Sequence, residues 1–172
     1  RSCLPCRLWL CIKYGAGGLQ TYQVPFHFRI LIIPIIPNTP MTREEDIRKA
    51  VEVLRKGGVI LYPTDTVWGI GCDATNEEAV KRVYDIKQRD DSKALICLVD
   101  SDARMQRYVR NVPDVAWQLI DSLQDSDSKP TTLILDGAIN LAANLIAEDG
   151  SIGMRITHEP FSKELCYRFQ RS

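Results

Sequence analysis

Three cations lie close together in the middle of the chain, and their types suit the binding of phosphate. Lys87 and Arg89 are two positions apart, and Lys93 follows four residues after Arg89. If a helix ends before Lys87 and the chain is then extended, the first two side chains project to the same side. Two such cations hold phosphate oxygens, and arginine adds a planar fork of donors. The alternative is a solvated helix end, where cations favour the helix dipole.

A turn rich in hydroxyl groups precedes these cations. Thr64, Asp65 and Thr66 follow Pro63, directly after an apolar run. Short polar side chains at such positions usually close the turn by hydrogen bonding to nearby backbone. Combined with the cations, they place hydroxyls and one carboxylate at the ends of predicted elements, where a phosphorylated ligand can be held.

A later strand carries two polar side chains on one face. In the segment 152–157, Arg155 and Thr157 share a face because strand side chains alternate. They would face a pocket, or Arg155 would form a structural ion pair with an acid. No Ser/His/Asp or Cys/His spacing indicates a covalent nucleophile, and His158 is interpreted as a surface turn residue. Catalysis would therefore rest on positioning and charge stabilisation.

Helices and strands alternate along the chain and must position these groups. The capping boxes Thr42-x-x-Glu45 and Thr75-x-x-Glu78 predict two helix starts. The first helix would end at Gly57-Gly58, and the second near residues 87–89. Apolar, β-branched runs predict strands over 59–62, 67–72, 94–99, 131–135 and 152–157. Further helices are predicted over 103–109, from Pro113 onwards, and over 160–169, with a polar loop over 121–129.

The helix that begins at Pro113 has an expected inward face formed by Val115, Leu119, Ile120 and Leu123. The alternation of strands and helices predicts an α/β sandwich with a twisted, mixed β-sheet flanked by helices.

The segment 62–73, which reads YPTDTVWGIGCD, followed by Lys87-Gln88-Arg89, resembles the signature of the YrdC/TsaC family. The resemblance runs from about Ile47 to the end of the chain. Members of this family are threonylcarbamoyl-AMP synthases that serve tRNA modification. The resemblance implies a YrdC-like open α/β sandwich.

The resemblance also implies roles for individual residues. Lys87 and Arg89 would be the catalytic pair that binds ATP and the nascent carbamate, and Lys93 would assist them. Asp90 replaces the proline that family members usually have after the arginine, which puts the geometry of this loop in question. Thr66 would contact the amino-acid substrate, and Asp65 would orient either a basic neighbour or the substrate ammonium.

Four further substrate-binding residues follow from the same resemblance. Thr132 aligns with a family threonine at a strand start, although an ordinary strand residue explains it equally well. Gly153 would let the nucleotide approach the backbone closely. Arg155 would border the nucleotide, and Thr157 would hold threonine.

The implied reaction converts ATP, bicarbonate and L-threonine into threonylcarbamoyl-AMP and pyrophosphate, for the formation of N6-threonylcarbamoyladenosine in tRNA. Mg²⁺ is expected on the triphosphate, although no carboxylate cluster marks a metal site in the protein. The implied partners are a downstream tRNA threonylcarbamoyl transferase complex and RNA or tRNA itself. Two alternatives stay open: a non-catalytic YrdC-like module that binds double-stranded RNA, and a carbamoyl-transfer domain of the hydrogenase maturation type.

Composition divides the chain at Met41. Residues 1–40 hold four cations and no acid, whereas residues 41–172 hold 18 cations and 22 acids. A mildly acidic body disfavours general binding to polyanions. Residues 1–40 are interpreted as a non-native or disordered extension, and 41–172 as a YrdC-like domain. The family's Ser-x-Asn motif would follow the segment equivalent to 161–171, so this domain is expected to be incomplete at its C-terminus.

The remaining features concern the cellular compartment. The apolar segment 31–37 is too short to span a bilayer and contains prolines, so no membrane association is expected. Cys72, Cys97 and Cys166 lie among apolar neighbours and predict buried free thiols in a reducing compartment, the cytoplasm. Cys3-x-x-Cys6, with Cys11 and His27, contains zinc-binding residue types, but its spacing does not match a zinc finger.

Overall fold

The chain alternates short strands with helices, as the sequence predicts. The computed structural model describes residues 9–11, 30–32, 42–87, 95–123 and 129–171. The strands are β1 (Trp9–Cys11), β2 (Ile30–Ile32), β3 (Val59–Tyr62), β4 (Gly69–Gly71), β5 (Ile96–Val99), β6 (Leu133–Leu135) and β7 (Ile152–Ile156). The helices are α1 (Arg43–Arg55), α2 (Glu77–Lys87), α3 (Asp102–Met105), α4 (Asp114–Ser122), the 3-10 helix η1 (Ala143–Leu145) and α5 (Pro160–Arg171).

The strands form two mixed sheets, where the sequence predicted one. The larger sheet has the order β1-β5-β7-β6, and the smaller has the order β2-β3-β4. Both sheets mix directions: β5 and β7 are parallel and β6 and β7 antiparallel, whereas β2 and β3 are parallel and β3 and β4 antiparallel. The α/β class is confirmed, and the division into two sheets is a correction that local periodicity cannot reveal.

Two of these strands lie within the first 40 residues. β1 pairs antiparallel with β5, and β2 pairs parallel with β3. The sequence predicted no regular structure in residues 1–40, so β1 and β2 are strands that the sequence did not predict. The interpretation of residues 1–40 as an extension outside the native domain stays a prediction.

The N-terminus of α1 is formed as its sequence dictates. The Thr42 hydroxyl accepts a hydrogen bond from the Glu45 amide at 3.4 Å, and the Glu45 carboxylate accepts one from the Thr42 amide at 3.1 Å. This reciprocal pair satisfies two amides that the first helical turn leaves open. The capping box predicted here is confirmed.

The second predicted capping box is wrong by one residue. Asn76 caps α2, because its side-chain oxygen accepts from the Ala79 amide at 3.0 Å. Thr75 instead donates its hydroxyl to Asp73 at 2.7 Å, within a small polar turn. Asparagine and threonine are both good N-cap residues. Because the Thr75 hydroxyl bonds to Asp73 in the preceding turn, Asn76 is the residue that caps the helix.

The predicted orientation of α4 is also wrong in part. Ile120 is buried as expected and Leu123 is half-buried, but Val115 is 71% exposed and Leu119 is exposed. The helix turns Ala116 toward the core instead. Apolar residues cover more than one face of this helix, so periodicity does not fix its rotation, and the small Ala116 side chain allows a close approach. Pro113 is the N-cap and not the first helical residue.

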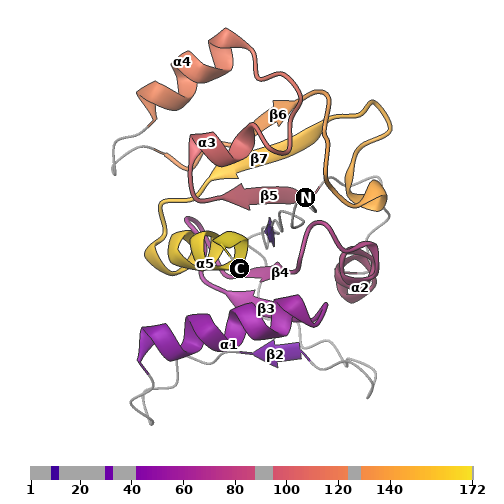
Figure 1. Cartoon of the computed structure of the whole chain (residues 1–172), viewed down its shortest axis with the longest axis vertical. Helices are drawn as coiled ribbons and strands as arrows, with labels where there is room; N and C mark the ends of the chain where they lie inside the picture. Colours follow the sequence, from indigo (N-terminus) through magenta and orange to yellow (C-terminus); the bar gives the residue numbers. More distant parts are fainter. Residues whose placement is uncertain (1–8, 12–29, 33–41, 88–94, 124–128, 172) are drawn as a thin grey trace, which may run out of the picture.

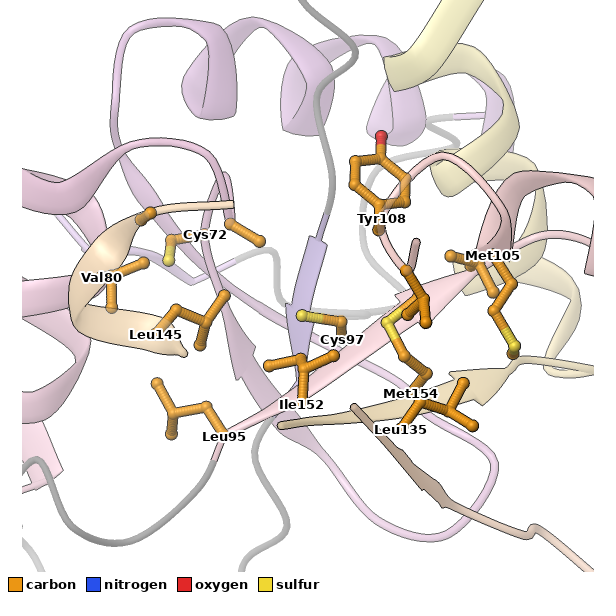
Figure 2. Packing of buried hydrophobic residues seen from close by; sticks show 14 of the residues in the cluster. Cys72, Val80, Leu95, Cys97, Met105, Tyr108, Leu135, Leu145, Ile152 and Met154 are labelled. Atoms are coloured by element: carbon orange, nitrogen blue, oxygen red, sulfur yellow. The ribbon is translucent and has the colours of Figure 1, made fainter. Parts of the chain in front are cut away.

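Successive side chains of β5 point to opposite faces of the sheet and pack into two separate hydrophobic cores. Leu98 joins the apolar residues of α1, α5 and β3, which include Ile47, Tyr62 and Phe169. Cys97 and Val99 join the cluster that Figure 2 shows, together with side chains of α2, β7 and η1. Figure 1 places α4 at one end of the molecule and α1 with β2 at the other. The larger sheet therefore separates two layers of packing.

No helix in the described part of the chain is long and apolar enough to cross a membrane.

Candidate active site

One face of β7 carries polar side chains that are buried. Arg155 is 3% exposed and Thr157, which follows the strand, is fully buried. In the parallel register, Arg155 lies beside Leu98 and Gly153 beside Ile96. The opposite face of β7 carries Ile152, Met154 and Ile156, as the period of two requires.

The guanidinium of Arg155 is bound by a neutral group. Its Nε and Nη2 atoms donate to the Thr132 hydroxyl oxygen at 3.1 and 2.5 Å. Within the described ranges, no carboxylate forms an ion pair with Arg155, so the predicted structural ion pair is not found there. A buried cation without a counter-charge is costly. The arrangement therefore favours a bound anion at this arginine.

Gly153 lies beside the same threonine. A Cβ atom built on Gly153 would stand 3.5 Å from Thr132 Cγ2 and 3.7 Å from the Leu95 carbonyl oxygen. These are ordinary contact distances, so the fold itself does not require glycine here. Ile134, opposite Gly153 in the β6–β7 register, is 77% exposed. This face is therefore open to solvent at Ile134 on β6, whereas Thr132 is half-buried and Gly153 and Arg155 are buried.

The turn between β3 and β4 combines a structural and an open residue. The Thr64 hydroxyl donates to the Val67 carbonyl at 2.5 Å and closes the turn. Thr66 is exposed, as are Val67 and Trp68. Thr64 therefore closes the turn through a hydrogen bond to nearby backbone, which is the usual role of a hydroxyl in a turn. Thr66 stays accessible to a ligand, as its predicted role requires.

Asp65 connects this turn to the segment after β7. Its Oδ1 atom accepts hydrogen bonds from the amides of His158 and Glu159 at 2.7 and 2.9 Å. Its Oδ2 atom is buried and has no hydrogen-bond partner among the described residues, and the same is true of the Thr157 hydroxyl oxygen. His158 itself is exposed, which confirms its prediction as a surface residue.

The start of α5 makes a second connection to the turn. The fully buried Ser162 donates its hydroxyl to the Pro63 carbonyl, and its amide donates to the Glu159 carboxylate at 2.7 Å. Ser162 was not predicted from the sequence, because no motif marks a serine inside a helix. The only available signal was its position just after Pro160, in the first helical turn.

The predicted catalytic cations are only partly described. Lys87 is the last residue of α2, which confirms the predicted helix end near residues 87–89. The helix does not end before Lys87, so the condition for an extended segment from Lys87 to Arg89 is not met at Lys87. Arg89 and Lys93 lie outside the described residues. Their roles stay predictions, as does that of Lys87.

A small cavity of about 50 Å³ lies on the other side of β7 from Arg155. Its lining includes Met154, Ile156, Leu133 and Ile120. This cavity belongs to the apolar layer under α4, and it does not touch the polar face of the strand. No group of three or more His, Cys, Asp or Glu side chains in the described part of the chain could hold a metal ion.

Cys72, Cys97 and Cys166 are buried free thiols, as predicted. Burial raises the pKa of Cys97, and burial together with the nearby charge of Asp73 raises the pKa of Cys72 well above its ordinary value. Both groups are therefore neutral thiols and poor nucleophiles. They contribute to packing and not to chemistry.

An α/β fold in which buried polar groups line one strand face, beside a Thr/Asp turn, is compatible with an enzyme that binds anionic small molecules. Residues 52–172 match the model of the Sua5/YciO/YrdC family, whose description is telomere recombination. This match covers well over half of the chain, so the chain belongs to the Sua5/YciO/YrdC family. The resemblance seen in the sequence is confirmed.

Relatives named threonylcarbamoyl-AMP synthase align with most of the chain. The identity is 32% over 130 residues with the protein of Halorhodospira halophila and 36% over 118 residues with that of Pseudomonas aeruginosa. The alignments cover 76% and 69% of this chain, and 66% and 62% of the two relatives. The chain thus spans just under two thirds of the length of these curated relatives.

Solved structures share the fold. Sua5 of P. abyssi, in complex with L-threonine, has a TM-score of 0.68 at 22% identity, over 83% of this chain and 39% of that one. YciO of E. coli has a TM-score of 0.65 at 27% identity, over 84% of this chain and 66% of that one.

Proposed function

We propose that this chain acts as an L-threonylcarbamoyl-AMP synthase. The amine of L-threonine and bicarbonate would give a carbamate and water. A carbamate oxygen would then attack the α-phosphorus of ATP, and the bond from that phosphorus to the bridging oxygen of pyrophosphate would break. The product, threonylcarbamoyl-AMP, would supply the threonylcarbamoyl group for N6-threonylcarbamoyladenosine in tRNA.

The observation that carries this proposal is the buried guanidinium of Arg155. It shares a face of β7 with Gly153, and its described partner is the neutral Thr132 hydroxyl. A charged group held in a low-dielectric site interacts strongly with an anion. Every reactant of the proposed reaction carries a carboxylate, a phosphate or a bicarbonate charge.

The remaining residues have defined tasks in this proposal. Lys87 and Arg89 would bind ATP and the nascent carbamate, with Lys93 beside them. Thr66 and Thr157 would hold L-threonine, and Gly153 would leave room for the nucleotide. Because these groups position reactants and stabilise charge, no covalent intermediate with the protein is needed. Mg²⁺ would arrive with the triphosphate of ATP.

The names of the relatives support the synthase over the two alternatives. The relatives from H. halophila and P. aeruginosa carry the synthase name, and P. abyssi Sua5 was solved with L-threonine. No observation favours an RNA-binding module or a hydrogenase-type carbamoyl-transfer domain. We further propose a cytoplasmic enzyme, which suits three buried thiols that stay reduced, and a tRNA threonylcarbamoyl transferase complex as the acceptor of the product.

The test is pyrophosphate release by the purified chain with ATP and bicarbonate, with and without L-threonine. We expect threonine-dependent release, and its loss in the double variant Lys87→Ala, Arg89→Ala. Lys81→Ala is the matched control, because Lys81 is an exposed cation on the same helix, α2. Release that does not depend on threonine, or full activity of the double variant, would contradict the proposed reaction or the proposed roles, respectively.

A further inference from the structure

Asp65 joins two segments that are far apart in the sequence. Its Oδ1 atom accepts from the amides of His158 and Glu159, which lie 93 and 94 residues away. Both amides come just after Thr157 and just before α5 begins at Pro160. One oxygen of this carboxylate therefore fixes the turn that carries Thr66 against the segment that carries Thr157.

The other oxygen of Asp65 has no such task in the described structure. Asp65 Oδ2 is buried and accepts no hydrogen bond there, and the Thr157 hydroxyl oxygen is likewise buried and without a partner. Leaving a buried polar atom unsatisfied costs far more than a hydrogen bond contributes, so such atoms need an explanation. The hydrogen bond from the His158 amide to Asp65 Oδ1 fixes Asp65 against the residue that directly follows Thr157.

We infer that Asp65 Oδ2 and the Thr157 hydroxyl bind the primary ammonium group of the amino-acid substrate. An ammonium group has three donors and no acceptor, whereas an ionised carboxylate only accepts. Such a charge-assisted hydrogen bond is short and stronger than a neutral one. Asp65 thus has two roles: Oδ1 positions the turn, and Oδ2 selects ligands with a positively charged nitrogen. This inference rests on the proposed function, and it decides between the two tasks that the sequence left open for Asp65, a basic neighbour or the substrate ammonium.

Ser162 allows the two roles of Asp65 to be separated. Its hydroxyl donates to the Pro63 carbonyl, so it fixes the same turn at a second point without involving the carboxylate. A Ser162→Ala variant should loosen the turn and leave Oδ2 in place. Asp65→Asn does the reverse, because the amide keeps an oxygen acceptor for the two backbone amides and replaces the other oxygen by an NH₂ donor.

The experiment is calorimetric titration of the full chain with L-threonine and, separately, with ATP. For Asp65→Asn we expect the Kd of L-threonine to rise at least tenfold and that of ATP to change less than twofold. Ser162→Ala should raise the Kd of L-threonine less than Asp65→Asn does. Asp149→Asn is the matched control, because the Asp149 carboxylate also accepts a backbone amide, from Ser151 at 2.9 Å, at an exposed position.

Two further measurements separate selection from positioning. Wild type should bind L-threonine more tightly than 2,3-dihydroxybutyrate, in which a hydroxyl replaces the amine, and Asp65→Asn should lose this preference. Hydrogen exchange at the amides of His158 and Glu159 should stay slow in Asp65→Asn and become faster in Asp65→Ala. Equal threonine affinities of wild type and Asp65→Asn would overturn the inference and leave the proposed function standing. A wild-type chain that binds no L-threonine would overturn both.

Discussion

The two faces of the five-residue strand β7 differ in polarity: one face is apolar and the other carries a buried charged side chain. On one face, Ile152 and Met154 pack into a closed apolar cluster with Cys97 and Leu135 (Figure 2). On the other face, Arg155 is just as deeply buried but bonds only to Thr132 among the described residues. Burial alone therefore does not distinguish a residue that only packs from a candidate site residue. The distinction lies in whether the buried polar atoms use their full hydrogen-bonding capacity within the protein.

This difference separates a face that contributes to stability from a face that we propose binds the ligand. Replacing a side chain on the apolar face by a smaller one should lower the protein's free energy of unfolding, because the surrounding atoms cannot fill the cavity that is left. The polar face holds groups whose hydrogen-bonding capacity is unused in the described structure, and a ligand can use that capacity. Substitutions on the two faces should consequently affect different measurements.

The largest effect on stability should come from the apolar face. Met154 is fully buried, so Met154→Ala should lower the free energy of unfolding by about 2–5 kcal/mol. Urea unfolding followed by circular dichroism measures this change. A loss below about 1 kcal/mol would show that this face is loosely packed, and the contrast between the two faces would fail.

An intermediate effect should appear at high pH. Burial raises the pKa of the Cys72 and Cys97 thiols, whose ordinary pKa is 9.0. Above that pH, the unfolded chain loses protons that the folded chain keeps, so stability falls as the pH rises. Each thiol should contribute about 1.4 kcal/mol per pH unit.

Urea unfolding of wild type and Cys97→Ala between about pH 8 and pH 10.5 isolates this contribution. The variant lacks one of the two thiols, so its stability should fall less steeply with pH, while tyrosine and lysine titration is common to both proteins. Identical slopes would show that the Cys97 thiol reaches solvent in the folded state.

A smaller effect on stability is expected at Gly153, on the polar face. Ala fits there at ordinary contact distances, so Gly153→Ala should change the free energy of unfolding by no more than about 1 kcal/mol. The affinity for ATP should nevertheless fall, since the added methyl group occupies the proposed nucleotide position.

Gly58→Ala is the matched control for glycine replacement. A Cβ at Gly58 would lie 2.8 Å from the Val53 carbonyl oxygen, so this variant should lose stability. An unchanged ATP affinity of Gly153→Ala would remove Gly153 from the site.

The smallest effect should occur on α4. Val115 is exposed, so Val115→Ser should alter the free energy of unfolding by less than about 0.5 kcal/mol, whereas the buried Ile120→Ala should cost about 2 kcal/mol or more. Thermal unfolding of the two variants distinguishes the observed rotation of the helix from the one that its sequence predicted. A large loss for Val115→Ser would restore the predicted inward face.

Local signals in the sequence were sufficient for most elements. The α1 capping box, strand β3 and the alternating strand β7 lie where the sequence predicts them. Thr132, directly before β6, lies beside Gly153 and Arg155 on β7, which agrees with a common site, although the predicted roles of these residues are untested. The predictions were wrong where the sequence fits two local structures about equally well, as in the choice of Thr75 or Asn76 as the cap of α2 and in the rotation of α4.

The sequence by itself determined the family, the order of most helices and strands between residues 42 and 171, and the alternation that places Arg155 and Thr157 on one face, because these depend on residue types a few positions apart. Only the tertiary structure decided the division into two sheets, the contact of Asp65 with the amides of His158 and Glu159, and the pairing of Arg155 with Thr132. Such contacts depend on how distant segments pack, and side-chain periodicity carries no information about which distant partner a residue will meet.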